Sequence, residues 1–330
     1  MDGGCRIGIH TSIAGDIADS LEIAHQLGAN TLQIFSSNPR MWVRHGSRLA
    51  APEAEQFRER RRALGLGPLV IHDNYLINLA SPEPVLRVRS VQAFHEEIIR
   101  AMALGADFLV AHPGSGRGAD RGRAIATIAE SLRQAARGLR LEALRILLEN
   151  TAGQGTALGS RFDELQAIIG ACPELPLGVC VDTAHLFAAG HDLRTEAGLE
   201  RALEIIEGTV GLARVFVVHA NDSKAPLGSR VDRHAHIGKG HIGLEGFRRI
   251  LNHRLLAGRA FILETPLDRP GEDRRNVATL WKLVGESAQA ARARDGFGMS
   301  RRRVAAKPTR RRRRGTRARP GRVQMKPRGR

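Results

Sequence analysis

Apolar residues follow two alternating patterns along most of this 330-residue sequence. Short runs rich in Val, Ile, Leu and Phe predict buried strands, and longer stretches with apolar residues three and four positions apart predict helices with one buried face. The predicted strands cover residues 6–10, 31–35, 69–71, 108–111, 146–148, 179–181, 215–218 and 261–263.

A helical pattern follows each of these eight strands. The predicted helices are marked by Ile17, Leu21, Ala24 and Leu27, by segment 53–64, by Val88, Val91, Ile98 and Met102, by Ile125, Ile128, Leu132 and Leu139, by segment 162–169, by Leu199, Leu203, Ile206 and Val210, and by segments 247–251 and 277–284. Strands that are apolar on both faces and alternate with helices eight times predict an α/β fold of the (β/α)8 TIM-barrel type rather than an open doubly wound sheet. No glycine-rich dinucleotide-binding fingerprint follows the first strand.

Charge divides the sequence into two parts. The chain has 51 Lys and Arg against 34 Asp and Glu, but residues 301–330 alone hold 15 basic residues and no acidic one. The remaining 36 basic and 34 acidic residues leave the rest of the chain close to neutral. Because a segment of this composition cannot bury a core, we predict one barrel domain over residues 1–292 and a disordered Arg-rich tail over residues 293–330.

Cysteine use and hydropathy indicate the compartment. Cys5, Cys172 and Cys180 are odd in number and far apart, which argues against a disulfide framework and suits a reducing environment. No apolar run after Met1 has signal-peptide length, and none reaches the length of about eighteen residues that suggests a membrane span. We therefore expect a soluble cytoplasmic protein with no membrane partner.

Side chains that can bind metal end every predicted strand from the third onward. They are His72, His112, Glu149, Asp182, His219 and Glu264. Any one of them alone would more commonly cap a helix or bond a loop. The C-terminal ends of barrel strands converge on the face that carries the active site, however, so all six are expected to meet in one bowl.

Three more candidates lie just beyond this ring: His185, three residues after Asp182, and Asp232 and His234 in the long seventh loop. Imidazole and carboxylate ligands without thiolate suit zinc in an open catalytic site, and also manganese or iron. Nine ligands exceed what one ion can use, which predicts two or three ions with one carboxylate bridging. Such a cluster suits phosphodiester hydrolysis, and the competing use of a metal-bearing barrel is sugar isomerisation.

Several segments resemble the signature motifs of the endonuclease IV family of apurinic/apyrimidinic endonucleases. These segments are IHDNYLINL at 71–79, AHPGS at 111–115, LENTAGQG at 148–155, VDTAH at 181–185, VHANDSK at 218–224, GSRVDRH at 228–234 and LET at 263–265. The resemblance extends from the first strand to about Leu283. It implies a zinc-bearing barrel that cleaves duplex DNA on the 5′ side of an abasic site, leaving a 3′-hydroxyl and a 5′-deoxyribose phosphate, with 3′-end trimming as a side activity.

The resemblance also implies a role for each candidate ligand. One zinc would bind His72, His112 and Glu149; Glu149 would bridge to a second, completed by Asp182, His219 and Glu264; a third would bind His185, Asp232 and His234, with manganese an alternative at one site. In this arrangement Glu149 is the central catalytic residue. The resemblance also implies a monomer. Because the implied substrate is DNA, it further implies association with the nucleoid.

Recognition in this family works by bending DNA and extruding the damaged nucleotide, which costs least where the base is missing. Arg40 matches the side chain that enters the base stack, and Tyr75 and Leu76 match those that fill the gap in the helix. Without the resemblance, Arg40 would be read as a phosphate contact and Tyr75 as a loop anchor. A metal-dependent sugar isomerase or epimerase would need none of the three, and a non-catalytic DNA-binding protein would not need nine ligands.

The Arg-rich tail has no counterpart in the family pattern. We expect it to add affinity for DNA phosphates that depends on salt but not on sequence. Deleting residues 296–330 should therefore flatten the dependence of duplex affinity on salt concentration, measured by titration. An unchanged slope would make the tail a solvated extension without a partner.

Overall fold

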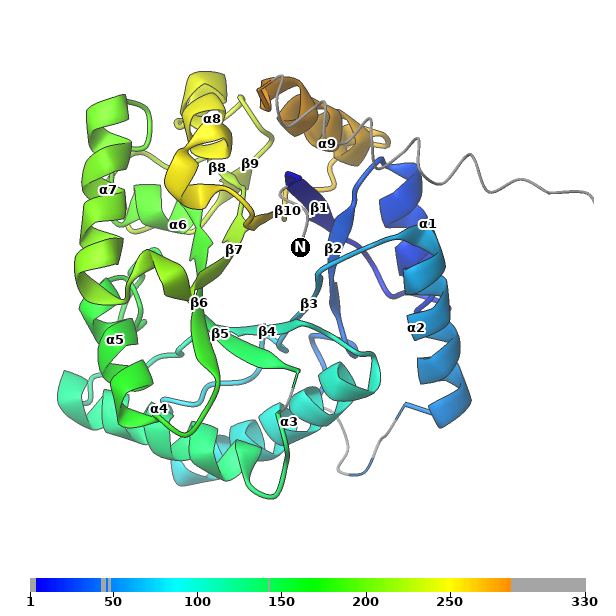
Figure 1. The fold of residues 1–330 in the computed structure, drawn as a ribbon. Coiled ribbons are helices and arrows are strands. Elements are labelled where there is room, and N and C mark those ends of the chain that lie inside the picture. The colour runs from blue at the N-terminus through cyan, green and yellow to red at the C-terminus, as the bar shows by residue number, and fades with distance from the viewer. Residues whose placement is uncertain (1–3, 43–45, 47–48, 142, 286–330) are drawn as a thin grey trace, which may run out of the picture.

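The computed structural model describes residues 4–42, 46, 49–141 and 143–285. Eight parallel strands close into a barrel in the order β1-β10-β7-β6-β5-β4-β3-β2, with helices around the outside (Figure 1). The barrel strands are β1 (Arg6–His10), β2 (Thr31–Phe35), β3 (Leu69–His72), β4 (Phe108–Ala111), β5 (Arg145–Glu149), β6 (Leu177–Asp182), β7 (Val215–His219) and β10 (Ala260–Leu263). The predicted TIM barrel is confirmed.

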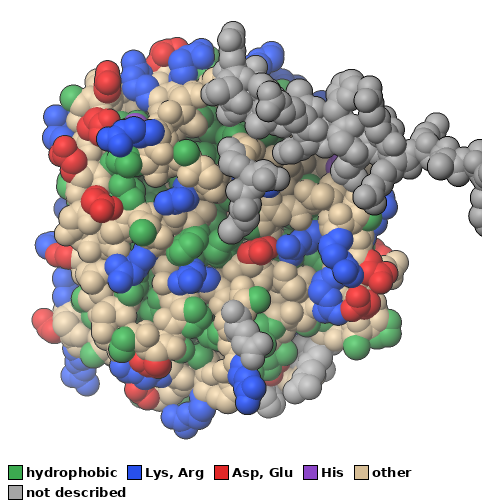
Figure 2. Space-filling model, viewed as in Figure 1, with side chains coloured by type: hydrophobic (Ala, Val, Ile, Leu, Met, Phe, Trp, Pro, Cys, Tyr) green, Lys and Arg blue, Asp and Glu red, His purple; other side chains and the backbone are tan. Residues whose placement is uncertain are grey.

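Helices cover the outer face of the barrel, and neighbouring helices pack on one another. They are α1 (Asp19–Gln26), α2 (Ala51–Leu64), α3 (Pro84–Ala103), α4 (Arg121–Ala136), α5 (Phe162–Ala171), α6 (Thr183–Ala188), α7 (Glu196–Thr209), α8 (Gly243–Asn252) and α9 (Glu272–Leu283), with 3-10 turns at Leu212–Arg214 and Arg254–Leu256. Figure 2, viewed as in Figure 1, shows Lys and Arg interspersed with Asp and Glu on the described part of this face.

The hydrophobic core has two layers, because alternate residues of a strand point to opposite faces. The larger layer lies between the strands and the helices. The smaller fills the barrel interior and consists of Val70, Val110, Leu147, Cys180, Val217, Ala260 and Ile262. All seven are at most 2% exposed, so the interior is packed and the space for chemistry lies above it, at the strand ends.

Three local features differ from the sequence prediction. A short helix, α6, begins directly after β6, and a two-residue antiparallel pair, β8 (Asp222–Ser223) with β9 (His234–Ala235), forms within the seventh loop. In α3 the predicted apolar stripe was partly wrong. Val88 and Met102 are 55% and 38% exposed, whereas the predicted Ile98 is buried and the buried face also includes Phe94, which was not predicted.

The predicted tail and the domain boundary at residue 292 lie outside the described residues. Within the described part of the chain, no helix combines the length and apolarity needed to cross a membrane.

Candidate metal centre at the C-terminal end of the barrel

The strand pleat explains how six of the candidate ligands reach one bowl. Each lies two positions after a residue of the barrel interior, so it points toward the barrel axis one layer higher. The pairs are Val70 and His72, Val110 and His112, Leu147 and Glu149, Cys180 and Asp182, Val217 and His219, and Ile262 and Glu264. An apolar residue followed two positions later by a polar one at a strand end is therefore the local pattern that builds this site.

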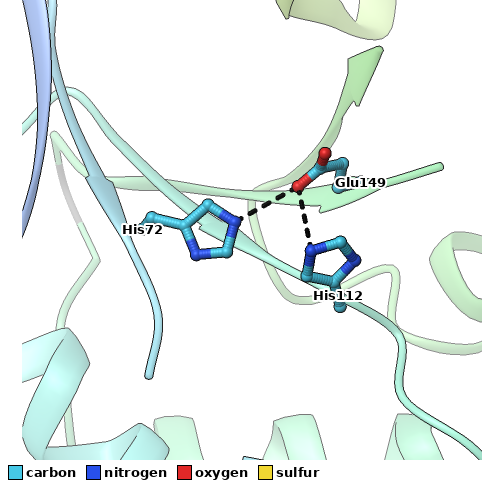
Figure 3. Close-up of side chains that lie close together, drawn as sticks. All are labelled: His72, His112 and Glu149. Carbon is cyan, nitrogen blue, oxygen red and sulfur yellow. Dashed lines mark hydrogen bonds and ion pairs between the residues drawn. The ribbon is translucent and has the colours of Figure 1, made fainter. Parts of the chain in front are cut away.

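One cluster joins His72 and His112 to Glu149. The Nε2 atoms of the two histidines lie 3.3 and 3.4 Å from Oε2 of Glu149. Figure 3 shows both rings directed at this single oxygen from neighbouring strands. The three side chains offer ligand atoms within 4.8 Å of one another, close enough to share an ion.

The other oxygen of Glu149 belongs to a second cluster. Its Oε1 lies 3.0 Å from Nδ1 of His219, and the same nitrogen is 3.3 Å from Oε2 of Glu264. Asp182 completes the group, and its strand residue pairs directly with His219 in the β6–β7 register. Because its two oxygens face different clusters, Glu149 has the geometry of a bridging carboxylate.

The third cluster combines Asp182 and His185 with His234. Asp182 caps α6, where its Oδ1 accepts the N–H of His185, and this places the imidazole one turn beyond the strand. Asp232 joins from the seventh loop, with Oδ2 3.1 Å from Nε2 of His185 and Oδ1 3.4 Å from Nε2 of His234. Nε2 of His234 is buried without a hydrogen-bond partner among the described residues.

Hydrogen bonds outside the clusters set which nitrogen of each histidine faces inward. Nδ1 of His72, His185 and His234 lies 2.9 to 3.1 Å from a backbone carbonyl oxygen, to which it donates its proton. His219 instead donates Nε2–H to Oε1 of Gln33, 2.8 Å away. In all four rings the other nitrogen therefore faces carboxylates of its cluster, which is the arrangement that metal-binding histidines require, and Nδ1 of His185 also lies 3.2 Å from Oε1 of Glu149. The residues fit a set of divalent cations.

Electrostatics lead to the same conclusion. Burial alone would lower the pKa of His72, but hydrogen bonding and charge interaction with Asp73 and Glu149 outweigh it and raise that pKa well above its usual value. Burial alone would raise the pKa of Glu149, but His219 and His112 hold it well below its usual range. The site therefore favours ionised carboxylates beside positive charge. Metal ions can supply this positive charge in place of the protons on the histidines.

Sequence reasoning missed the residues that support the candidate ligands. Gln33 is fully buried, and its Nε2 donates to Glu264 at 2.5 Å while its Oε1 accepts from His219. Asn221 donates to Oδ2 of Asp182 at 2.6 Å, and Asn150 accepts the N–H of Asp182 at 2.7 Å. The signal available in the sequence was a single polar residue, Gln33, inside an apolar strand.

A fourth group of acidic and imidazole side chains lies beside the bowl. His236 Nε2 is 3.2 Å from Glu272 and 3.7 Å from Asp268. The amide of Asn276 is oriented by the N–H of Ile237, which donates to its Oδ1, so its Nδ2 donates to Nδ1 of His236 at 3.0 Å. The proton of His236 is thus on Nε2, toward the carboxylates, which is the reverse of the pattern in the three clusters.

The residues predicted to contact DNA lie on two loops at the rim of the bowl. Arg40 is exposed, and Tyr75 is 63% exposed, with the centroid of its ring 5.1 Å from that of Phe35 in an edge-on arrangement. Asn74 ties the loops together by donating to the carbonyl of Met41 at 2.7 Å. Tyr75 and Leu76 line a cavity of about 680 Å³ that also reaches candidate metal ligands. Their contact with DNA stays a prediction.

Comparison with known proteins places the chain in a family. The family described as xylose isomerase-like TIM barrel matches residues 21–292. A probable endonuclease 4 of Solibacter usitatus is 50% identical over 286 residues, covering 85% of this chain and 97% of that protein. A probable endonuclease 4 of Chloroflexus aurantiacus is 43% identical over 282 residues, covering 84% and 98%.

Solved structures agree. Endonuclease IV from Thermus thermophilus superposes with a TM-score of 0.75 at 41% identity, covering 84% of this chain and 98% of that one. An Escherichia coli 3-keto-D-glucoside 4-epimerase, YcjR, has a TM-score of 0.60 at 13% identity, covering 84% and 99%, and shows a shared fold alone. The chain therefore belongs to the endonuclease IV family of the xylose isomerase-like TIM barrels.

Proposed function

We propose that this protein is a DNA-repair endonuclease that hydrolyses the backbone of duplex DNA on the 5′ side of abasic sites, leaving a 3′-hydroxyl and a 5′-deoxyribose phosphate. The observation that carries the proposal is the junction of three His and carboxylate clusters through Glu149 and Asp182. Relatives named probable endonuclease 4 support the reaction class. Removal of blocked 3′ ends is proposed as a side activity of the same site.

Three zinc ions, or two with manganese at the remaining site, would be held by the nine residues identified above. Bound there, divalent ions supply a nucleophile at neutral pH and neutralise the charge that develops on a phosphoryl group in transfer. Glu149 holds the first two clusters together, and Asp182 links the second to the third. Gln33 keeps His219 in the tautomer that directs Nδ1 inward.

The test is incision of an end-labelled duplex that carries one abasic analogue. The expected product is a cut immediately 5′ of the lesion, with the undamaged duplex left intact. A fully metal-loaded protein that makes no cut would overturn the proposal. Ketose epimerisation would be measured on the same preparation, because the barrel is shared with sugar epimerases.

Tyr75 should contribute to damage recognition and not to the metal centre. Stacking between a base and an aromatic ring is worth about 1 to 3 kcal/mol, so Tyr75→Ala should lower kcat/KM for the abasic duplex by roughly 5- to 150-fold. Tyr75→Phe retains the ring and its contact with Phe35, and should stay close to wild type. Incision kinetics would be compared at equal metal content. An alanine variant with full activity would make Tyr75 a loop anchor.

Asp222 should be needed to present the ligands of the seventh loop. It is completely buried and accepts three N–H groups of segment 238–242 at 2.9 to 3.0 Å, which closes the base of the loop that carries Asp232 and His234. Asp222→Asn would turn an amide donor toward these N–H groups. We expect the affinity for one ion per chain to fall roughly 10- to 100-fold, as for other residues that orient ligands.

The measurement for Asp222→Asn is zinc content after equilibration with a graded series of chelator concentrations. Asp19→Asn is the matched control, because Asp19 is exposed and belongs to none of the His and carboxylate groups. If Asp222→Asn retained as much zinc as the wild type, the loop would keep its shape without this carboxylate.

A further inference from the structure

Two arginines hold a backbone conformation that usually belongs to glycine. Among the described residues, those other than glycine with a positive φ are Arg117, at 46°, and Arg230, at 56°. Eighteen glycines occupy the other positive-φ positions, so glycine is the usual solution in this chain. An arginine that carries this conformational cost indicates that its side chain has a use.

Arg230 lines a cavity of about 390 Å³ together with Arg121 and Arg161. The cavity lies between the loops that precede α4 and α5, which are neighbours on the outside of the barrel (Figure 1). Much of its wall is the glycine-rich segment 152–161, and no acidic residue of the described chain lines it. A concave wall of guanidinium groups and small residues suits a tetrahedral oxyanion.

Two of the three guanidinium groups have carboxylate partners. Nε of Arg121 lies 2.9 Å from Oε1 of Glu164, whose side chain is 3% exposed, and Nε of Arg161 donates to Asp163 at 3.0 Å. Arg230 is exposed, and its side chain has no acidic partner among the described residues. The cavity thus combines two oriented cations with one whose charge is not neutralised.

The position of the cavity indicates which oxyanion it would bind. It shares Ala152 and Ala157 with the larger cavity that is lined by His112, His185 and Asp232. Arg230 precedes Asp232 by two residues, a span of at most about 7 Å even in extended chain. A strand whose phosphodiester lies in the metal centre would bring a neighbouring phosphate to this place.

We propose that Arg230, Arg121 and Arg161 bind a backbone phosphate on the cleaved DNA strand. This phosphate neighbours the phosphodiester that is cleaved. The assignment rests on the proposed nuclease function. Each phosphate contact contributes about 0.9 to the slope of log affinity against log salt for duplex DNA. Losing the contact should therefore affect binding and its salt dependence, with the chemical step unchanged.

The test compares the metal-loaded wild type with Arg230→Gly, which relieves the backbone strain and so keeps the loop folded. The control is Arg140→Ala, which removes an exposed arginine near the opposite end of the barrel, ahead of β5. We expect KM for the abasic duplex to rise about 5- to 10-fold for Arg230→Gly, kcat and zinc content to stay unchanged, and the salt slope of kcat/KM to flatten by about 0.9. Arg230→Lys should recover part of the loss.

Other outcomes would overturn the assignment. An unchanged salt slope with normal incision would exclude the phosphate contact, and a loss of zinc or of kcat would make Arg230 part of the metal-binding loop. Competition by inorganic phosphate that depends on Arg230, without a change in slope, would assign the cavity to free phosphate. Failure of the wild type to incise any abasic duplex would instead refute the nuclease function, so the two failures are distinguishable.

Discussion

Glu149→Gln is expected to slow incision about 1000-fold while the barrel stays folded. The substitution keeps the shape of the side chain but removes the charge whose two oxygens face His72 and His112 on one side and His219 on the other. If the loss of bridged ions removes about 4 kcal/mol of transition-state stabilisation, incision falls about 1000-fold. Single-turnover incision of the abasic duplex and zinc content would be measured on the same sample.

The control for this substitution is Glu204→Gln, which makes the same chemical change at an exposed position on α7. It should keep wild-type activity and zinc content. An active Glu149→Gln enzyme with a full set of ions would show that the bridging charge is not needed, and the shared-carboxylate geometry would then have no catalytic meaning.

Removal of the metal ions is expected to stop incision and to lower thermal stability. Glu149, Asp182 and Glu264 are close together, and without cations their charges must be balanced by protons on the histidines. An ion present at about 100 times its Kd stabilises the folded state by about 2.7 kcal/mol, and losing one should lower Tm by roughly 5 to 10 °C.

Chelator-treated protein would be examined by calorimetry and by incision, then reloaded with zinc or with manganese. Chelator already saturated with zinc is the control for direct effects of the reagent. Recovery of both Tm and activity on reloading is the expected result. A metal-free protein that still cuts at abasic sites would refute metal-dependent hydrolysis.

The sequence pattern predicted the strands better than the helices. The strand pattern predicted the barrel because each strand is a short apolar run whose neighbours in sequence are also its neighbours in the sheet. The helix after Asp182 was missed because its six residues are all buried, so it shows no amphipathic stripe. Val88 and Met102 were misassigned because helical spacing indicates a face, but the packing of α3 decides which face is covered.

The sequence alone determined which side chains enter the bowl. A polar residue two positions beyond an inward-facing apolar residue has its direction set by the pleat of its own strand, as for Val70 and His72. Local geometry carries that information, so no knowledge of the partner strands was needed. Gln33 does not follow this pattern, because the residue two positions before it is the polar Thr31.

The tertiary structure decided how these side chains are grouped and which nitrogen each histidine presents. Gln33 sets the tautomer of His219 across 186 residues of sequence, and the two oxygens of Glu149 are divided between clusters drawn from the C-terminal ends of six strands. It also placed Arg230 beside Arg121 and Arg161. Such groupings depend on barrel closure and on the path of the loops, which bring distant segments within hydrogen-bonding distance and leave no periodic pattern in the sequence.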